Sequence, residues 1–171
     1  MNPKVLSKMS YGMYVVGSGL DGEDNAMIAN AALQVTSKAK TVAVIINKEL
    51  RTHSFITKSG HFSLSVLNKE TPNDFIRRLG FSAGKSDEKM AGLSVRRHGS
   101  LPVILDHACA YMTAKVIGHL DVLTHTIFVG EVLEAEVIDE SEPLTYEDYR
   151  KNKGATPITA PTFNIEKLRK E

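Results

Sequence analysis

The chain has 171 residues, of which 42% are hydrophobic and 24% charged, and this ordinary globular composition excludes a disordered or fibrous protein. Its 21 lysines and arginines against 20 aspartates and glutamates give a net charge of +1, so we expect neither a nucleic-acid partner nor an anionic membrane surface. The single cysteine, Cys109, excludes an internal disulfide and a multi-cysteine metal site, and we expect no metal. There is no apolar run of the roughly 20 residues that a membrane span needs, and no signal peptide is recognised, so we expect one cytoplasmic domain.

Three short strands are expected in the first half of the chain. Residues 11–18 are rich in strand formers and lead to the turn signal Asp21-Gly22. Residues 41–47 form a nearly continuous apolar and β-branched run, which predicts a strand buried on both faces. Residues 61–67 alternate apolar side chains with serines, which predicts a half-buried strand.

Two short helices separate these segments. Residues 51–59 carry apolar side chains on one face and are followed by Gly60, a helix stop signal. A second helix is expected after Thr71, with Thr71 as its cap and Pro72 in its first turn. Residues 80–87 are small, polar and glycine-containing, which predicts a loop.

The second half of the chain favours β-structure. Residues 103–105, 108–120 and 124–138 are β-favouring segments joined by brief connections. Two long neighbouring strands with a short turn must pair antiparallel, because a parallel pair needs a crossover of about a dozen residues. Residues 139–171 are charged and contain prolines, which predicts an extended tail. We therefore expect a mainly β protein, an antiparallel barrel with a few short helices.

One motif points to a different fold. Residues 17–22 (GSGLDG) match G-x-G-x-x-G, follow a predicted strand and precede residues 24–33, which are compatible with a helix. In a dinucleotide fold, however, Asp21, Glu23 and Asp24 would crowd the pyrophosphate with three carboxylates. The remaining sequence also lacks the regular alternation of strands and full-length helices that such a fold requires. We interpret the motif as a hairpin turn.

Two segments carry the groups that hold a phosphate without a metal, namely backbone N–H groups, hydroxyls and a cation. They are residues 34–40 (QVTSKAK) and 82–86 (SAGKS). Serine, glycine and lysine are also the ordinary residues of loops, so each segment by itself is better explained as a solvated turn.

Several segments share their order with a known family. They are residues 25–37 leading into the strand at 41–44, residues 59–67 (SGHFSLSVL), the segment 81–90 (FSAGKSDEKM) and residues 125–132 (HTIFVGEV). In these segments the chain resembles the flavin reductase-like proteins with an FMN-binding split barrel. Residues 146–149 and 153–162 are similar to the tail of the flavoredoxin, ferric reductase and high-molecular-weight rubredoxin branch. The resemblance covers about Tyr11 to Thr162.

The chain departs from the family pattern at four positions. Ala39 stands where proline is common, and Ala83 and Ser86 replace a serine and an aspartate of the glycine-lysine loop. These changes leave a phosphate pocket intact. Thr124 stands where an aspartate usually precedes the strand histidine, so the resemblance gives no carboxylate beside His125.

The resemblance implies an FMN-binding split β-barrel of Greek-key type over residues 1–145, with residues 146–171 as a tail on the barrel or on a partner subunit. It also implies a homodimer with the flavin near the subunit interface. The positions carried over are Asn30, Gln34, Val35, Thr36 and Ser37 along the ring and ribityl chain, Asn47, Lys48 and Thr52 on the next strand and turn, and Ser82, Gly84 and Lys85 at the phosphate.

The sequence thus predicts an FMN-containing oxidoreductase that takes hydride from NAD(P)H and passes electrons to flavin, ferric iron or a small redox protein. The alternative is an FMN-binding electron carrier without NAD(P)H oxidoreductase activity, because no nicotinamide fingerprint is left once the glycine motif is interpreted as a turn. A third hypothesis is a split barrel that binds another planar ligand, such as haem or pyridoxal phosphate.

Single side chains allow two interpretations each. His125 is a candidate catalytic residue that donates a hydrogen bond or a proton near the flavin, and a structural role in its strand is the alternative. Cys109, flanked by alanines, is expected to be a buried, inert thiol. The basic groups Arg77-Arg78 and Arg96-Arg97-His98 are expected on solvated faces, where they would otherwise attract an NAD(P)H phosphate or an acidic partner.

Overall fold

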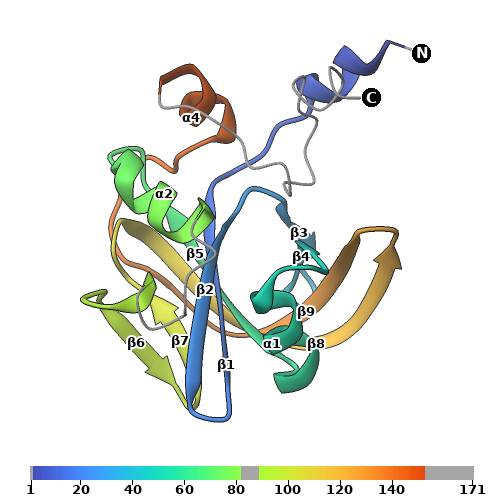
Figure 1. Cartoon of the computed structure of the whole chain (residues 1–171), viewed down its shortest axis with the longest axis vertical. Helices are drawn as coiled ribbons and strands as arrows, with labels where there is room; N and C mark the ends of the chain where they lie inside the picture. Colours follow the sequence, from blue (N-terminus) through green and yellow to red (C-terminus); the bar gives the residue numbers. More distant parts are fainter. Residues whose placement is uncertain (1, 82–88, 153–171) are drawn as a thin grey trace.

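Seven strands form one antiparallel sheet in the computed structural model, which describes residues 2–81 and 89–152 (Figure 1). The order across the sheet is β2-β1-β5-β8-β9-β4-β3. The strands are β1 (Tyr14–Leu20), β2 (Glu23–Ala29), β3 (Ala32–Thr36), β4 (Thr41–Asn47), β5 (His61–Leu67), β8 (Ala108–Val122) and β9 (His125–Val137).

The two edge strands of this sheet, β2 and β3, are consecutive in the chain and are joined by Asn30 and Ala31. A two-residue connection between opposite edges forces the sheet to curl round on itself. No pairing joins β2 to β3 in the described residues, so the curled sheet stays open along that seam. The expected mainly β, antiparallel split barrel is confirmed.

The glycine motif is a hairpin, as predicted. β1 pairs with β2 from Tyr14↔Ala29 to Leu20↔Glu23, and the turn residues Asp21 and Gly22 have φ angles of 52° and 83°. Positive φ at both central residues is typical of the tight turns that match the twist of a hairpin. Residues 24–33, which a dinucleotide fold would need as a helix, form β2 and the start of β3 instead.

Gly17 and Gly19 have a separate packing role. A second sheet of two strands, β6 (Val95–His98) and β7 (Leu101–Ile104), lies against β1. A Cβ atom at Gly19 would lie 2.1 Å from the carbonyl oxygen of Ser100, and one at Gly17 would lie 2.7 Å from that of Pro102. The glycines therefore allow β7 to approach the backbone of β1.

The predicted half-buried strand at 61–67 is more buried than expected. Ser63 and Ser65, which alternation assigns to solvent, are both buried. Ser63 donates a hydrogen bond of 2.5 Å to the carbonyl oxygen of Pro102, so β7 covers this face of β5. The strand at 41–47 is buried as predicted.

Helices lie outside the sheet. Helix α1 (Arg51–Ser59) ends as predicted at Gly60, whose φ is 70° and whose N–H donates to the carbonyl of Ile56. Helix α2 (Asn73–Phe81) begins just after Pro72 and includes the first two residues of the predicted loop 80–87; the rest of that loop lies outside the described residues. A 3₁₀ helix, η1 (Pro3–Lys8), precedes the barrel.

The expectation of an extended chain after residue 139 is wrong over one stretch. Residues 146–152 form helix α4 (Tyr146–Asn152), and the side chains of Tyr146 and Tyr149 are buried. They pack with Phe75, Ile76 and Leu79 of α2, so two aromatic side chains one turn apart are enough to hold this short charged segment as a helix.

The core has two parts. The first fills the barrel and includes Val44, Ile46, Phe62 and Phe128, with Ile56 of α1 packed against them. The second lies under α2 and α4. No helix in the described part of the chain is long and apolar enough to cross a membrane.

Candidate functional site

Three of the predicted site residues lie toward the end of β4. Asn47 is the last residue of β4 and pairs with His125, the first residue of β9. The N–H of Ile45 donates to the carbonyl of Ala31 at 3.0 Å, which extends the β3–β4 pairing and brings Asn30 to the same end. Asn30 and Asn47 are each only 7% exposed. The structure therefore places two buried amides and an imidazole at the same end of the β3–β4–β9 ladder, although they are far apart in sequence.

Four other predicted residues follow the edge strand β3. Gln34, Val35 and Thr36 are exposed, a bulge interrupts the pairing between Gln34 and Thr36, and Ser37 begins the turn into β4. At about 3.3 Å per residue, Gln34 lies about 13 Å from Asn30 along the strand. A ligand that touches both ends of this hairpin must therefore be elongated.

Lys48 and Thr52 occupy the corner between β4 and α1. The N–H of Lys48 donates to the carbonyl of Thr124 at 2.9 Å, and the side-chain oxygen of Asn47 accepts from the N–H of Glu49 at 2.9 Å. These two bonds fix the turn that leads into α1. Thr52 is buried in the first helical turn.

His125 has a hydroxyl neighbour instead of the carboxylate common in the family. Its Nδ1 atom lies 2.8 Å from the hydroxyl oxygen of Thr124, and its side chain is half-buried. This contact holds the imidazole ring against the turn that precedes β9.

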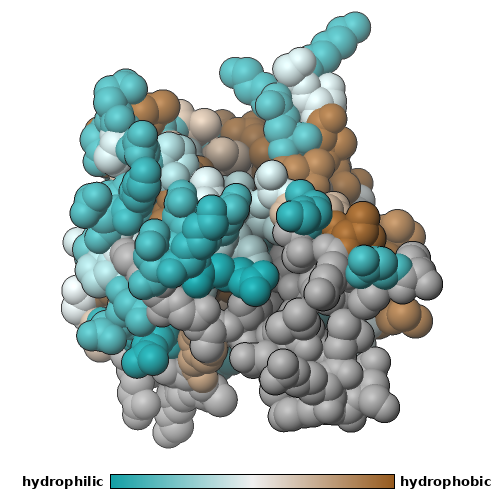
Figure 2. All heavy atoms as spheres, turned by 90° about the horizontal axis from the view of Figure 1, so that it is seen from above, coloured by the Kyte–Doolittle hydropathy of each residue, from teal (hydrophilic) through white to brown (hydrophobic). Residues whose placement is uncertain are grey.

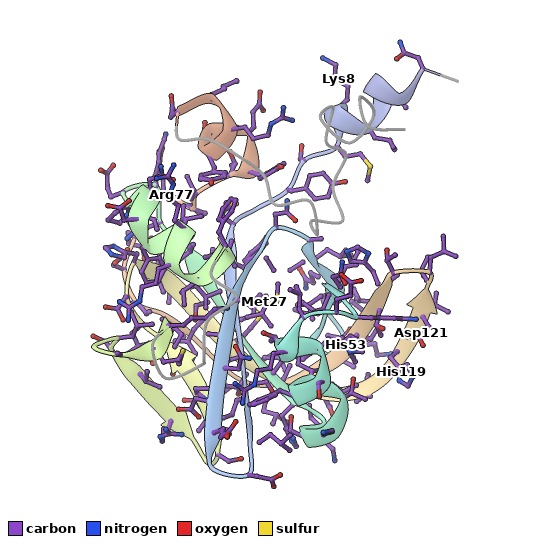
Figure 3. All side chains as sticks on the ribbon, in the orientation of Figure 1. Lys8, Met27, His53, Arg77, His119 and Asp121 are labelled. Atoms are coloured by element: carbon purple, nitrogen blue, oxygen red, sulfur yellow. The ribbon has the colours of Figure 1, made fainter. Side chains whose placement is uncertain are left out.

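A hydrogen-bonded chain lies directly behind this corner and was not expected from the sequence. The hydroxyl of Thr126 donates to Oδ1 of Asp121 at 2.6 Å, and Nε2 of His53 lies 2.8 Å from the same hydroxyl oxygen. Oδ2 of Asp121 lies 3.3 Å from Nζ of Lys48. Figure 3 shows His53 on α1 beside the β8–β9 hairpin that carries Asp121 and His119.

The electrostatics of this chain follow from its contacts. Burial lowers the pKa of His53, and Lys48 and His119 lower it further, although Asp121 raises it. The hydrogen bond from Thr126 and the contact with Lys48 hold the pKa of Asp121 below its ordinary value. At neutral pH this hydrogen-bonded chain therefore contains the neutral imidazole of His53 and the ionised carboxylate of Asp121.

Alternation along β9 could have pointed to Thr126. Neighbouring residues of a strand face opposite sides of the sheet, so a functional His125 on one face places Thr126 on the barrel side. The contact with His53 spans 73 residues of sequence and involves no local motif.

The phosphate-binding candidates Ser82, Gly84 and Lys85 lie outside the described residues. The chain is described again from Lys89, whose pKa is lowered first by burial and then by the charge of Arg51. Arg51 is the first residue of α1, so the charge that acts on Lys89 lies at the helix start that follows the Asn47–Lys48 corner.

The candidate cysteine is explained by packing in the core, and two of the candidate arginines are explained by ion pairs. Cys109 is buried as predicted, and burial raises the pKa of its thiol, which disfavours the reactive thiolate. Arg96 donates to the hydroxyl of Tyr111 at 2.8 Å and pairs with Glu136, and Arg97 pairs with Asp24. These two arginines are held by partners of their own chain.

The described donor set fits the ring and polyol chain of a flavin. Amides at Asn30 and Asn47 match the alternating N–H and C=O groups of the isoalloxazine edge, and hydroxyls at Thr36 and Ser37 match a polyol chain. Strand β3 has no strand on its outer side in the described residues, so its backbone can bind a ligand. The buried hydroxyl of Thr41, which pairs with Thr36 across the hairpin, has no hydrogen-bond partner among the described residues.

Comparison with known proteins agrees with this fold. The family model described as the flavin reductase like domain matches residues 6–155. The chain is 43% identical to the ferric-chelate reductase (NAD(P)H) of Archaeoglobus fulgidus over 95% of this chain and 98% of that protein. It is 40% identical to the high molecular weight rubredoxin of Moorella thermoacetica over 96% of this chain and 73% of that protein.

A solved structure with the same fold is that of the flavin reductase PheA2 in its native state. It is 25% identical, superposes with a TM-score of 0.71, and the match covers 83% of this chain and 88% of that chain. The family model, the two sequence relatives and the shared fold all agree. The chain belongs to the flavin reductase-like family of oxidoreductases.

Proposed function

We propose that the chain is an FMN-containing oxidoreductase that takes hydride from NAD(P)H and passes electrons to flavin, ferric iron or a small redox protein. The observation that carries this proposal is the location of Asn30, Asn47 and His125 at one end of the β3–β4–β9 ladder, beside an exposed edge strand. The name of the Archaeoglobus relative, a ferric-chelate reductase that uses NAD(P)H, supports the same donor and one of these acceptors.

The residues of the chain have separable roles in this proposal. Asn30 and Asn47 orient the ring by hydrogen bonds to its polar edge, and the half-buried His125 holds or releases a proton at its imidazole beside them. Gln34, Val35, Thr36 and Ser37 bind the ribityl chain along β3, with Lys48 and Thr52 at the neighbouring corner. Bound FMN would supply the hydride and electron chemistry, while the protein supplies orientation and electrostatics.

The phosphate is assigned to Ser82, Gly84 and Lys85. The charge of Arg51, at the start of α1, acts on Lys89 and supports this assignment, because Lys89 follows the assigned residues closely in the sequence. A cation and hydroxyls next to the first turn of a helix form a suitable environment for an anion.

A homodimer is part of the proposal. Leu33, Leu120 and Val122 are 46–61% exposed and share one face of the β3-β4-β9-β8 part of the sheet with Asn47 and His125. Hydrophobic side chains gather on the same side of the molecule in Figure 2. An apolar face of this kind is typical of an interface between subunits, and a second copy would cover the ring site.

A visible spectrum of the purified protein tests the cofactor. We expect flavin absorption bands, or their appearance and a quenched flavin fluorescence on titration with FMN. Absence of both would refute the proposal. A parallel titration with FAD separates the two flavins, because only FMN is expected to bind tightly.

The alternative function is an FMN-binding electron carrier without NAD(P)H oxidoreductase activity. The relative named high molecular weight rubredoxin, of which this chain covers 73%, motivates this alternative through its name. Anaerobic mixing with NADH or NADPH separates the two functions. Rapid bleaching of bound flavin supports the reductase, whereas bleaching only by dithionite or by a reduced partner protein supports the carrier.

A further inference from the structure

The Asp121 carboxylate connects a buried hydroxyl to an exposed lysine of the proposed flavin site. Thr126, at its inner end, is 1% exposed, and the side chain of Asp121 is 60% exposed. Lys48, at the outer end, lies at the β4–α1 corner. The carboxylate therefore ties a flexible surface side chain to the rigid barrel.

Each bond in this chain sets the direction of the next. Ionised Asp121 only accepts hydrogen bonds, so the single proton of the Thr126 hydroxyl points to it at 2.6 Å. The Thr126 oxygen must then accept from Nε2 of His53 at 2.8 Å. His53 thus fixes the Thr126 hydroxyl, which in turn fixes the carboxylate.

We propose that Asp121 is a positioning residue of the flavin site: it holds the Lys48 ammonium at the β4–α1 corner, where Lys48 contacts the bound flavin. This inference rests on the proposed function. A free lysine side chain loses considerable rotamer entropy when it is fixed on a ligand, and a lysine already held by Asp121 loses less on binding. The expected benefit is tighter flavin binding.

The location of the ion pair supports a role in the site. The N–H of Lys48 is bonded to Thr124, the residue before His125, and Asp121 pairs with Thr126, the residue after it. The hydrogen-bonded chain therefore contacts the residues on either side of His125 and does not involve the His125 side chain. Among the described residues, His119 is a further titratable group that acts on Asp121, and its ring centroid lies 6.3 Å from that of Phe128.

FMN titrations of four proteins test the proposal: wild type, Asp121→Asn, Lys48→Met and the double variant. We expect Asp121→Asn to raise the Kd for FMN by about two- to fivefold, the range of an exposed ion pair. In the Lys48→Met background the same substitution is expected to have no further effect, because the two residues act as one unit.

The sign of the change in Kd separates position from charge. Removing a negative charge by itself tightens the binding of an anionic ligand, whereas loss of positioning weakens it. At 1 M NaCl the Debye length falls to about 3 Å and an exposed ion pair is itself screened, so the difference in Kd between wild type and Asp121→Asn is expected to shrink.

Glu142→Gln is the matched control. It removes an exposed carboxylate that is paired with Lys69 at 2.7 Å, outside the proposed site. We expect its Kd for FMN to equal that of wild type. Thr126→Val, which removes the bond that orients Asp121, is expected to weaken binding by about twofold, and Thr126→Ser to restore it.

Two results would overturn the proposal while leaving the proposed function intact. One is FMN binding by Asp121→Asn that is as tight as in wild type, even with a lowered melting temperature, since that describes a structural role. The other is an Asp121→Asn effect of full size in the Lys48→Met background. Failure of wild type itself to bind FMN would instead refute the proposed function and, with it, this inference.

Discussion

Nε2 of His53 lies 2.8 Å from the hydroxyl oxygen of Thr126, and this contact fixes the tautomer of the imidazole. Since the threonine proton is committed to Asp121, Nε2 must carry the proton and Nδ1 of a neutral His53 is deprotonated. We expect the ¹⁵N chemical shifts of His53 to report this single tautomer. Thr126→Val is expected to give a mixture of tautomers, and Thr126→Ser to retain one. A mixture in wild type would contradict the assignment.

The lowered pKa of His53 predicts a pH dependence of stability. Because burial keeps the folded-state pKa below that of the unfolded chain, the unfolded state binds more protons as the pH falls below about 6.5. The contribution of His53 to stability is therefore complete above that pH and is lost as the pH falls through the folded-state pKa. Urea unfolding of wild type and His53→Gln at pH 7.5 and 5.5 measures it. We expect the wild type to lose more stability between these pH values, and equal losses would contradict the prediction.

Gly19 is predicted to be a packing residue of the β1–β7 contact. A Cβ atom there would lie 2.1 Å from the carbonyl oxygen of Ser100, a backbone atom that cannot rotate away. We expect Gly19→Ala to destabilise the fold by about 1–3 kcal/mol, as overpacking does. Gly118→Ala is the control, since nothing lies within 4 Å of its Cβ position. Denaturant unfolding of both variants checks the difference, and equal midpoints would refute the packing role.

The elements with a clear local pattern could be predicted from the sequence, and those held only by tertiary contacts could not. Strand β4 has a continuous apolar run and α1 ends at a glycine, so both were expected. Strand β6 (VRRH) is mostly exposed and charged, and only its pairing with β7 makes it a strand. Helix α4 is likewise held by tertiary contacts, because its two buried tyrosines pack against α2.

The same distinction applies to the site. The family resemblance assigned Asn30, Asn47 and His125, but their proximity depends on the strand order, in which β9 lies beside β4 although their sequences are far apart. The link between His53 and Thr126 has no local signature, because a hydroxyl that bridges an imidazole and a carboxylate is set by register alone. Register is a property of the whole sheet and cannot be inferred from a single strand.

The apolar outer face predicts a dimer that a single charge can disrupt. Leu120 is 61% exposed and lies in register with Ile127 of β9. A buried, unpaired carboxylate at this position is strongly unfavourable, so we expect Leu120→Glu to shift the protein from dimer to monomer in sedimentation velocity. Val137→Glu, at the far end of β9, is the control and is expected to remain dimeric. A monomeric wild type, or dissociation by both substitutions alike, would contradict this interface.

His125 is predicted to act in turnover more than in flavin binding. It pairs with Asn47 in the ladder through backbone groups, so removing the imidazole leaves the corner of the site in place. We expect His125→Ala to retain FMN with a Kd within about threefold of wild type and to lose ten- to a hundredfold in kcat, at the lower end of what a general acid or base contributes. Thr124→Val, which removes the hydroxyl 2.8 Å from Nδ1, is expected to have a smaller effect of the same kind. Anaerobic stopped-flow reduction by NADH and FMN titration measure the two quantities separately. Loss of soluble protein or of bound flavin in His125→Ala would identify a structural residue, whereas slow reduction of a fully loaded protein would assign the imidazole to the chemistry.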